Sequence, residues 1–245
     1  MGSVSIIIPA LNEERSLGRT LRCLSILSPA AREVIVVDGG STDQTLAVAE
    51  QFDVRLVEAD QPGRSRQMNT GAKIATGDYL CFLHADTLVP DDLVSLIETT
   101  LADPAIACGG FISLMTGPQQ TRWLTSLHNC AKTYYAPLLF RPHLFLRGLR
   151  LLFGDQVMFC RRKDFWRCGG FDAALPIMED ADLCRKFVRQ GIGRIVQVNR
   201  VVWTSDRRVA RWGALKANAI YLTIGFLWGM GVSAIALSRL YKDVR

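Results

Sequence analysis

Apolar runs and amphipathic segments alternate along the N-terminal part of the chain. Four short runs rich in Val, Ile and Leu are typical of buried strands, at 4–8, 33–37, 54–57 and 79–83. Segments with helical spacing follow them, at 13–27, 43–52, 65–75 and 91–101. We expect Asn12 to cap the first of these helices, because its side chain can accept a hydrogen bond from the first turn. The alternation predicts an α/β fold with a mainly parallel sheet and helices on both faces.

The rest of the chain alternates less regularly. Strands are expected at 106–115, 157–160 and within 195–203, and helices at 122–135, from Glu179 to before Gly191, and beyond 203. We divide the chain into a domain at 1–210 and a C-terminal helical segment at 211–245. Within this segment, residues 218–237 carry no charge and are long enough to span a bilayer. Their three glycines favour instead a helix packed on the domain or lying on a membrane surface.

Charge and cysteine content narrow the class of protein. The 245 residues carry a formal net charge of +6, which suits an anionic partner such as nucleotide phosphates or an acidic membrane surface. No DNA- or RNA-binding signature accompanies the charge, so we expect no nucleic acid partner. The seven cysteines are scattered without a C-x-x-C pair, and the first apolar run is too short for a signal peptide. These features predict a cytoplasmic location, with peripheral contact to the membrane as a further option.

Polar residues stand at the carboxyl ends of the predicted strands. Asn12 follows the first strand, Asp38 and Ser41 follow the second, and Asp86 follows the fourth. Because ligands of open α/β sheets bind at this edge, these residues predict one binding site. The chain contains neither G-x-G-x-x-G nor G-x-x-x-x-G-K-[ST]. We therefore do not expect a dinucleotide-dependent enzyme or a P-loop NTPase.

Each strand-end residue also has a purely structural explanation. Asp38 can accept a hydrogen bond from a nucleoside, or it can close a tight turn with Ser41. Asp86 can ligate Mg²⁺ or Mn²⁺, hard cations that prefer oxygen. His84 can ligate Mn²⁺, bind phosphate or ribose, or simply end a strand. The residues alone leave these alternatives open.

Two basic segments are candidates for phosphate binding. Arg64 and Arg66 lie where a glycine-containing loop feeds a helix, a place that favours an anion. The segment "SDRR" at 205–208 follows a strand-like stretch and could close over a diphosphate. Either segment could also be a solvated basic surface.

Three acids in four residues begin the helix at 179, in "MEDADL". Carboxylates are favourable in a first helical turn, which offers a structural explanation. The cluster is larger than a helix start requires. It therefore predicts that one of the three acids can act as a general base, provided that it reaches an acceptor hydroxyl.

Taken together, the motifs resemble family 2 glycosyltransferases, which have the GT-A fold. Their order and spacing match over about residues 3–210. The matching segments are "VSIIIPALNEE", "VIVVDGGSTDQT", "GRSRQMNTGAKIATGDYLCFLHADT" and "FGDQVMFCRRKDFWRCGGFDAALPIMEDADLCRK". The motifs "LHADT", "GDQ" and "MEDADL" further resemble a subgroup of small bacterial enzymes in which "LHADT" replaces D-x-D.

The resemblance implies roles for the candidate residues. Asp86 would be the metal ligand of D-x-D, with His84 in place of the first acid, and Asp180 would be the catalytic base beside Glu179. The donor would contact the residues Pro9, Ala10, Asn12, Glu13, Asp38, Ser41, Arg64, Arg66, Ala85, Arg207 and Arg208. The implied cofactor is Mg²⁺ or Mn²⁺. The implied partners are a nucleotide-diphospho-sugar, most simply a UDP-sugar, and a hydroxyl acceptor that is a small molecule or lipid-linked.

These roles imply an inverting, metal-assisted transfer of a sugar to the acceptor hydroxyl. Two alternatives remain at this stage. One is a nucleotidyltransferase that makes nucleotide sugars, although "PALNEERS" lacks the glycine-rich loop of such enzymes. The other is a non-catalytic protein that binds nucleotide sugars or a membrane surface.

Overall fold

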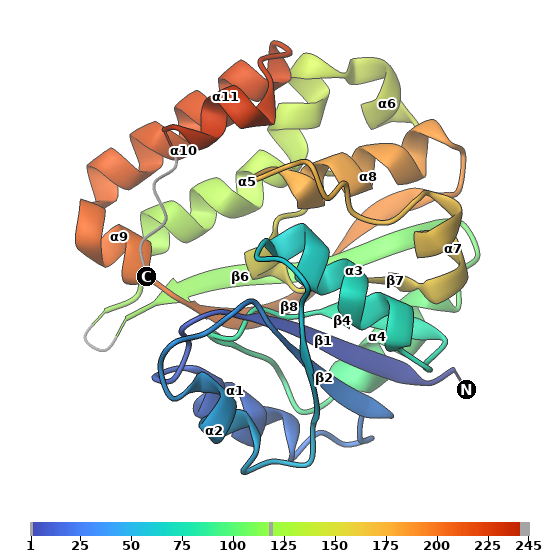
Figure 1. Cartoon of the computed structure of the whole chain (residues 1–245). Coiled ribbons are helices and arrows are strands. Elements are labelled where there is room, and N and C mark those ends of the chain that lie inside the picture. Colours follow the sequence, from blue (N-terminus) through green and yellow to red (C-terminus); the bar gives the residue numbers. More distant parts are fainter. Residues whose placement is uncertain (1, 118–119, 241–245) are drawn as a thin grey trace.

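A single eight-stranded sheet runs through the molecule (Figure 1). The computed structural model describes residues 2–117 and 120–240, so the last five residues of the predicted C-terminal segment lie outside it. The strands are β1 (Val4–Ala10), β2 (Glu33–Asp38), β3 (Arg55–Glu58), β4 (Tyr79–Phe82), β5 (Thr87–Leu88), β6 (Ile106–Thr116), β7 (Met158–Arg161) and β8 (Arg194–Ser205). Their order across the sheet is β3-β2-β1-β4-β7-β6-β8-β5.

The sheet is parallel in its first half and mixed in its second. Strands β3, β2, β1 and β4 are all parallel, and β6 is parallel to β8. The short β7 is antiparallel to both of its neighbours, and β5 is antiparallel to β8. The sheet is therefore mainly parallel, with an antiparallel insertion where the second half joins the first.

Helices cover both faces of the sheet, as the alternating pattern predicted. They are α1 (Leu17–Leu24), α2 (Thr45–Ala49), α3 (Arg64–Ile74), α4 (Leu93–Leu101), α5 (Trp123–Phe140), α6 (Pro142–Leu146), α7 (Arg162–Arg167), α8 (Glu179–Arg189), α9 (Arg207–Trp212), α10 (Ala214–Gly229) and α11 (Ala234–Ser238). A 3₁₀ turn, η1, spans Gly154–Gln156. In Figure 1, α1 and α2 lie below the sheet, whereas α3, α8, α5 and α10 lie above it.

The side chains of β1 point alternately to the two faces of the sheet and so belong to two separate core clusters. Ile6 and Ile8 are fully buried in the cluster that contains α1 and α4, whereas Ile7 is buried in the cluster that contains α3 and α8. Successive side chains of a strand point to opposite faces, so a continuous apolar run is what a strand buried on both faces needs. Gly71 lets α3 approach closely, because a β-carbon there would lie 3.1 Å from the Val37 side chain and overlap Ile7.

The register of β1 and β2 brings the strand-end residues to one edge of the sheet. Ala10 lies opposite Asp38, so the loops after the two strands leave the sheet side by side. The buried Gln67 of α3 donates to the backbone oxygens of Ala10 (2.7 Å) and Val37 (2.8 Å). This side chain fastens the two strand ends beneath the binding edge.

The C-terminal segment packs on the domain. Helix α10 lies along α5, where Asn218 donates to Thr125 at 2.9 Å and the rings of Phe140 and Phe226 meet edge to face. The uncharged stretch does not form one helix, because α10 ends at Gly229 and Gly231, with φ +99°, turns the chain into α11. Among the described residues, no helix is both long and apolar enough to cross a membrane.

One detail of the predicted secondary structure is wrong. Asn12 does not cap a helix: it has φ +54° in a turn, and α1 begins only at Leu17. Its side-chain oxygen accepts from the backbone of Thr42 at 2.9 Å, in the loop after β2. A contact with another loop, invisible in the local sequence, therefore replaces the helix cap. The predicted helix at 122–135 is also longer, because α5 continues through Pro137 to Phe140.

Candidate functional site

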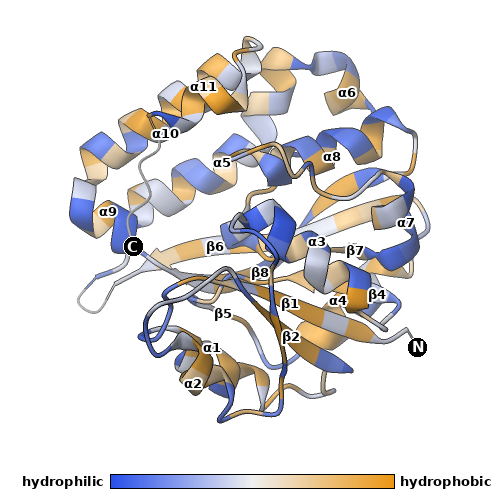
Figure 2. Cartoon of the chain, viewed as in Figure 1, coloured by the Kyte–Doolittle hydropathy of each residue, from blue (hydrophilic) through white to orange (hydrophobic). Residues whose placement is uncertain are grey.

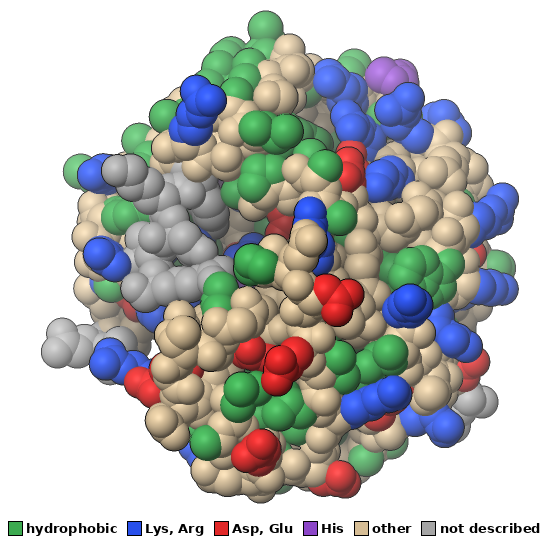
Figure 3. Space-filling model, in the orientation of Figure 1, with side chains coloured by type: hydrophobic (Ala, Val, Ile, Leu, Met, Phe, Trp, Pro, Cys, Tyr) green, Lys and Arg blue, Asp and Glu red, His purple; other side chains and the backbone are tan. Residues whose placement is uncertain are grey.

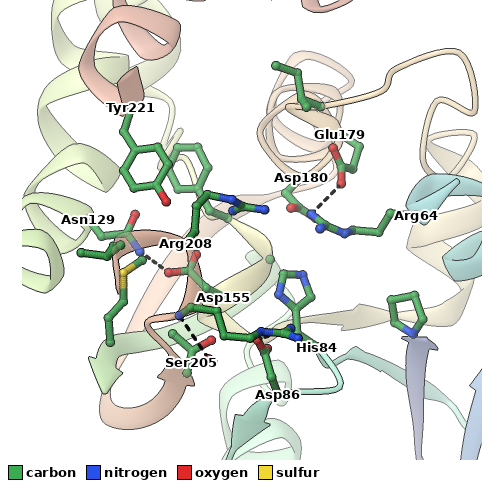
Figure 4. Close-up of a pocket in the computed structure, with 18 of the residues that line it drawn as sticks. Arg64, His84, Asp86, Asn129, Asp155, Glu179, Asp180, Ser205, Arg208 and Tyr221 are labelled. Carbon is green, nitrogen blue, oxygen red and sulfur yellow. Dashed lines mark hydrogen bonds and ion pairs between the residues drawn. The ribbon is translucent and has the colours of Figure 1, made fainter. Parts of the chain in front are cut away.

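A cavity of about 240 Å³ opens at the carboxyl edge of the parallel strands. Its walls come from both halves of the chain, and Figure 4 shows side chains from several elements pointing into it. The predicted site residues that line it are Pro9, Ala10, Glu13, Arg64, His84, Ala85, Asp86, Glu179, Asp180, Arg207 and Arg208. The fold thus brings together residues that lie far apart in the sequence.

The remaining candidates lie outside the lining and close the neighbouring turns. The Asp38 carboxylate is buried and accepts from the backbone of Gly40 and Ser41, both at 2.8 Å, and from the Ser41 hydroxyl at 2.5 Å. The Ser41 hydroxyl oxygen also accepts from the backbone of Asn12 at 2.9 Å. Arg66 is exposed on α3. Asp38, Ser41 and Asn12 therefore link the two loops that border the cavity.

One arginine bridges the acids at the base of the cavity. Arg207, at the start of α9, donates to Asp86 and to Glu13, both at 2.8 Å. The second Glu13 oxygen, Oε2, is buried without a partner among the described residues. Burial raises the pKa of Glu13 although Arg207 acts against it. Two carboxylates from different loops thus share one guanidinium cation.

His84 lies next to Asp86, shortly after the end of β4 (Figure 4). Its Nε2 atom is buried and has no partner among the described residues. Burial and, after it, the nearby arginines hold the pKa of His84 well below its ordinary value. A neutral imidazole with an unused ring nitrogen can bind a metal or share a hydrogen bond with a ligand.

This donor set fits a divalent cation that brings its own ligands. The described residues contain no group of three or more His, Cys, Asp or Glu side chains able to hold a metal by themselves. Asp86 and the unpartnered nitrogen of His84 can supply at most a part of a coordination shell. Mg²⁺ and Mn²⁺ often bind through one or two protein ligands together with substrate phosphates and water. The site therefore fits such a cation together with a diphosphate.

Two acids at the start of α8 face the cavity from the opposite side. Glu179 pairs with Arg64 at 3.4 Å (Figure 4). Asp180 is 6% exposed, and burial and then the charge of Glu179 raise its pKa well above the ordinary value, against the influence of Arg64. The preceding Met178 has φ +66°, a conformation that costs a non-glycine residue about 1–3 kcal/mol and is common at active sites. The raised pKa makes Asp180 suited to accept a proton.

Gly154 in η1 joins the two sides of the cavity. A β-carbon at this position would lie 2.6 Å from Cε1 of His84 and 3.1 Å from Oδ2 of Asp180. Its backbone also donates a hydrogen bond to Asp180. No other residue type fits here without moving the imidazole or the carboxylate.

The polar wall formed by α5 and η1 was largely missed by the sequence analysis. Asp155 Oδ2 accepts from Ser113 at 2.7 Å and from Asn129. Lys132 extends over the Phe153 ring, 3.5 Å from its centroid, and burial lowers its pKa to about 8. The "GDQ" motif was the available signal for Asp155. Asn129 and Lys132 had none, because α5 has no motif and its role depends on tertiary packing.

The arrangement offers two chemical functions across one cavity. Arg207, Arg208, Asp86 and His84 lie on one side, where an anionic group would be held. A buried carboxylate with a raised pKa lies on the other. Such a site can stabilise a departing anion while removing a proton from an attacking group.

Comparisons with known proteins agree with this geometry. The family model for glycosyl transferase family 2 matches residues 5–169. The chain is 42% identical over 194 residues to a PGL/p-HBAD biosynthesis glycosyltransferase of Mycobacterium bovis BCG, covering 73% of this chain and 66% of that protein. It is 30% identical over 117 residues to the glucosyl-3-phosphoglycerate synthase of Mycolicibacterium smegmatis, covering 44% and 38%. The chain thus spans less than two thirds of either curated relative.

A solved structure extends the likeness to the whole fold. Glucosyl-3-phosphoglycerate synthase from Mycobacterium tuberculosis, in complex with Mn²⁺, UDP and phosphoglyceric acid, superposes with a TM-score of 0.64. The identity is 22%, and the match covers 94% of this chain and 79% of the other. The predicted GT-A fold is confirmed by this likeness.

Proposed function

The chain belongs to glycosyl transferase family 2, and on that premise we propose that it transfers a sugar from a nucleotide-diphospho-sugar to a hydroxyl acceptor, with inversion. One observation carries the proposal: Asp86 and His84 lie on one side of the cavity, and the buried Asp180, with its raised pKa, lies on the other. A nucleotidyltransferase has no need for such a base. Groups with such shifted pKa values concentrate at catalytic sites, which favours an enzyme over a non-catalytic binding protein.

In the proposed reaction, the donor lies over the loop that contains Pro9, Ala10 and Glu13, with its diphosphate near Arg64, Arg207 and Arg208. Asp180 accepts the proton of the acceptor hydroxyl as that oxygen attacks the anomeric carbon. The nucleoside diphosphate leaves from the opposite face. Preorganised positive charge at the leaving group is commonly the largest contribution to such catalysis.

Asp86 and His84 would hold a divalent cation, which when bound supplies positive charge to the leaving diphosphate. Mn²⁺, UDP and phosphoglyceric acid are bound by the structural neighbour. We propose Mg²⁺ or Mn²⁺ and a UDP-sugar for this chain. Arg207 would then exchange its bridge between Glu13 and Asp86 for the diphosphate, which is also a good partner for a guanidinium.

Titration calorimetry with UDP, GDP and dTDP, each with and without Mn²⁺, tests this proposal. We expect one nucleotide to bind in a metal-dependent manner. The Asp86→Ala variant should lose about tenfold or more in affinity, which is about 1.4 kcal/mol. Asp53→Ala, at an exposed acid away from the cavity, serves as the matched control. Binding that is insensitive to both Mn²⁺ and Asp86→Ala would contradict the metal role.

We further propose that the acceptor is reached at an anionic membrane surface. Large apolar side chains are exposed along α5, α10 and α11, including Leu127, Leu215, Phe226, Met230 and Ile235. Figure 2 shows hydrophobic residues along α10 and α11, and Figure 3 shows hydrophobic side chains exposed at the top of the molecule, where these helices lie in Figure 1. The exposed Arg211, Lys216 and Arg239 add the charge complementary to acidic lipids. Sedimentation with phosphatidylserine-containing vesicles should carry the protein down, and Leu215→Ser with Ile235→Ser should release it; equal sedimentation of both proteins would refute the contact.

A further inference from the structure

A second, smaller cavity continues the catalytic cavity between α5 and α10. Its volume is about 30 Å³, and it shares Lys132, Phe153, Met178 and Gly225 with the larger one. Beyond these shared residues its walls are mainly apolar, formed by the side chains of Ala136, Pro137, Phe140, Leu149, Leu151 and Trp228. A polar cavity that holds the reacting groups thus leads directly into an apolar one.

The far end of the small cavity is lined by two arginines that are already engaged. Arg141 donates to the backbone oxygens of Phe140 (2.6 Å) and Gly229 (3.1 Å). The Arg185 guanidinium lies over the Trp228 ring, 5.6 Å from its centroid. The volume of the cavity, about 30 Å³, limits what it can hold. It is therefore suited to a short apolar group rather than to a long chain.

The helix face that borders both cavities is open at one position. Tyr221, Gly225, Trp228 and Gly229 recur at the spacing of one face of α10, and all four line one or both cavities. A β-carbon added at Gly225 would meet no atom within 4 Å. At Gly229, by contrast, a β-carbon would lie 2.5 Å from atoms of the Phe140 ring. The space beside Gly225 is thus the passage between the two cavities.

We infer that this small cavity is an acceptor subsite, which takes a short alkyl group attached to the hydroxyl-bearing part of the acceptor. The inference rests on the proposed transfer reaction and names the chemical class of its acceptor. The hydroxyl lies at Asp180, the polar part contacts the wall of Asp155 and Lys132, and the alkyl group lies beyond Gly225. Apolar surface that leaves water here adds affinity in proportion to its area.

Two probes that share the same hydroxyls test the inference. Methyl β-D-glucoside has no apolar extension, whereas n-butyl β-D-glucoside adds three carbons. Their affinities are measured by calorimetry on the whole protein, with and without UDP and Mn²⁺. We expect the butyl compound to bind about tenfold more tightly, less than full burial of three methylenes would give, because the cavity is small. Equal affinities for the two probes would overturn the inference.

Variants at Gly225 test whether the alkyl group of the butyl glucoside binds in the small cavity. Gly225→Leu should fill the passage and abolish the preference for butyl, whereas Gly225→Ala, the matched control, should retain it. Both are good helix formers, so α10 should be preserved, as circular dichroism can verify. A second variant, Trp228→Ala, enlarges the cavity and should shift the preference towards n-hexyl β-D-glucoside. A butyl preference that persists in Gly225→Leu would place the alkyl group elsewhere and overturn the subsite.

Measuring nucleotide binding distinguishes a failure of this inference from a failure of the proposed function. If UDP binds but the two glucosides do not differ, the subsite is wrong and the transfer reaction stands. If none of UDP, GDP and dTDP binds, the proposed function fails. The glucoside affinities measured without nucleotide then still decide whether the small cavity takes an alkyl group.

Discussion

The carboxylates on the two sides of the cavity lie in different surroundings. On the side of β1 and β2, the buried Asp38 receives three hydrogen bonds from its own turn. On the side of α8, Asp180 is buried beside Glu179, and its pKa is raised. Burial next to another acid disfavours the charged form of a carboxylate. The turn of Asp38 is built for stable structure, whereas α8 retains a group whose proton can move.

Among the changes that test this difference, Asp180→Asn should have the largest effect, a loss of turnover. The amide cannot accept the acceptor's proton, and a general base contributes about 10²–10⁴-fold to the rate. Turnover of the nucleotide sugar should therefore fall by that factor, while nucleotide affinity measured by calorimetry should remain within about twofold. Asp182→Asn, in the same helical turn but paired with Arg185 at 2.6 Å, is the control. Full activity in Asp180→Asn would move the base to another residue.

Gly154→Ala tests whether the two sides depend on their closest approach. The added β-carbon would press on His84 and Asp180 together. Overpacking of this kind costs about 1–3 kcal/mol of stability. Displacement of the base should also reduce turnover by about ten- to a hundredfold, measured alongside the melting temperature. Gly225→Ala, where the added carbon meets open space inside helix α10, should by contrast raise stability by about 0.5–1 kcal/mol. If Gly154→Ala behaves like Gly225→Ala, the two sides are less tightly coupled than the structure indicates.

The smallest expected effect is on the pH dependence of stability. The folded-state pKa of Asp180 lies well above the ordinary value of 3.8, so the folded protein holds this proton more tightly than the unfolded chain does. The resulting stabilisation is present at low pH and is lost as the pH rises from the ordinary value through the raised one. Asp155, Glu179 and Arg64 face the same carboxyl and contribute to its pKa.

Asp180→Asn should therefore melt at a higher temperature than the wild type above the raised pKa, and the two should converge at acid pH. Each kcal/mol corresponds to about 2–4 °C for a domain of this size. Thermal melts of both proteins at several pH values measure the difference. A constant difference across the whole range would mean that the Asp180 carboxyl is not the source.

A difference between local patterns and tertiary packing explains which parts of the fold and the site could be predicted from the sequence. The parallel half follows from local patterns, because each strand is a continuous apolar run and each loop follows it directly. The edge that contains Asp86 could therefore be located by position alone. Asn129 and Lys132 could not, since they enter the site only because α10 and η1 pack against α5. The misassigned cap at Asn12 has the same origin, a bond to a loop 30 residues away.

The position of Gly154 has a consequence for folding. This glycine touches a histidine from the first half of the chain and an aspartate that follows it by a whole strand and helix. Neither half alone contains all three residues, so a partly folded chain can have its strands and turns in place and still lack the site. Catalysis then becomes a measure of complete folding, and refolding followed by activity should lag behind refolding followed by secondary structure.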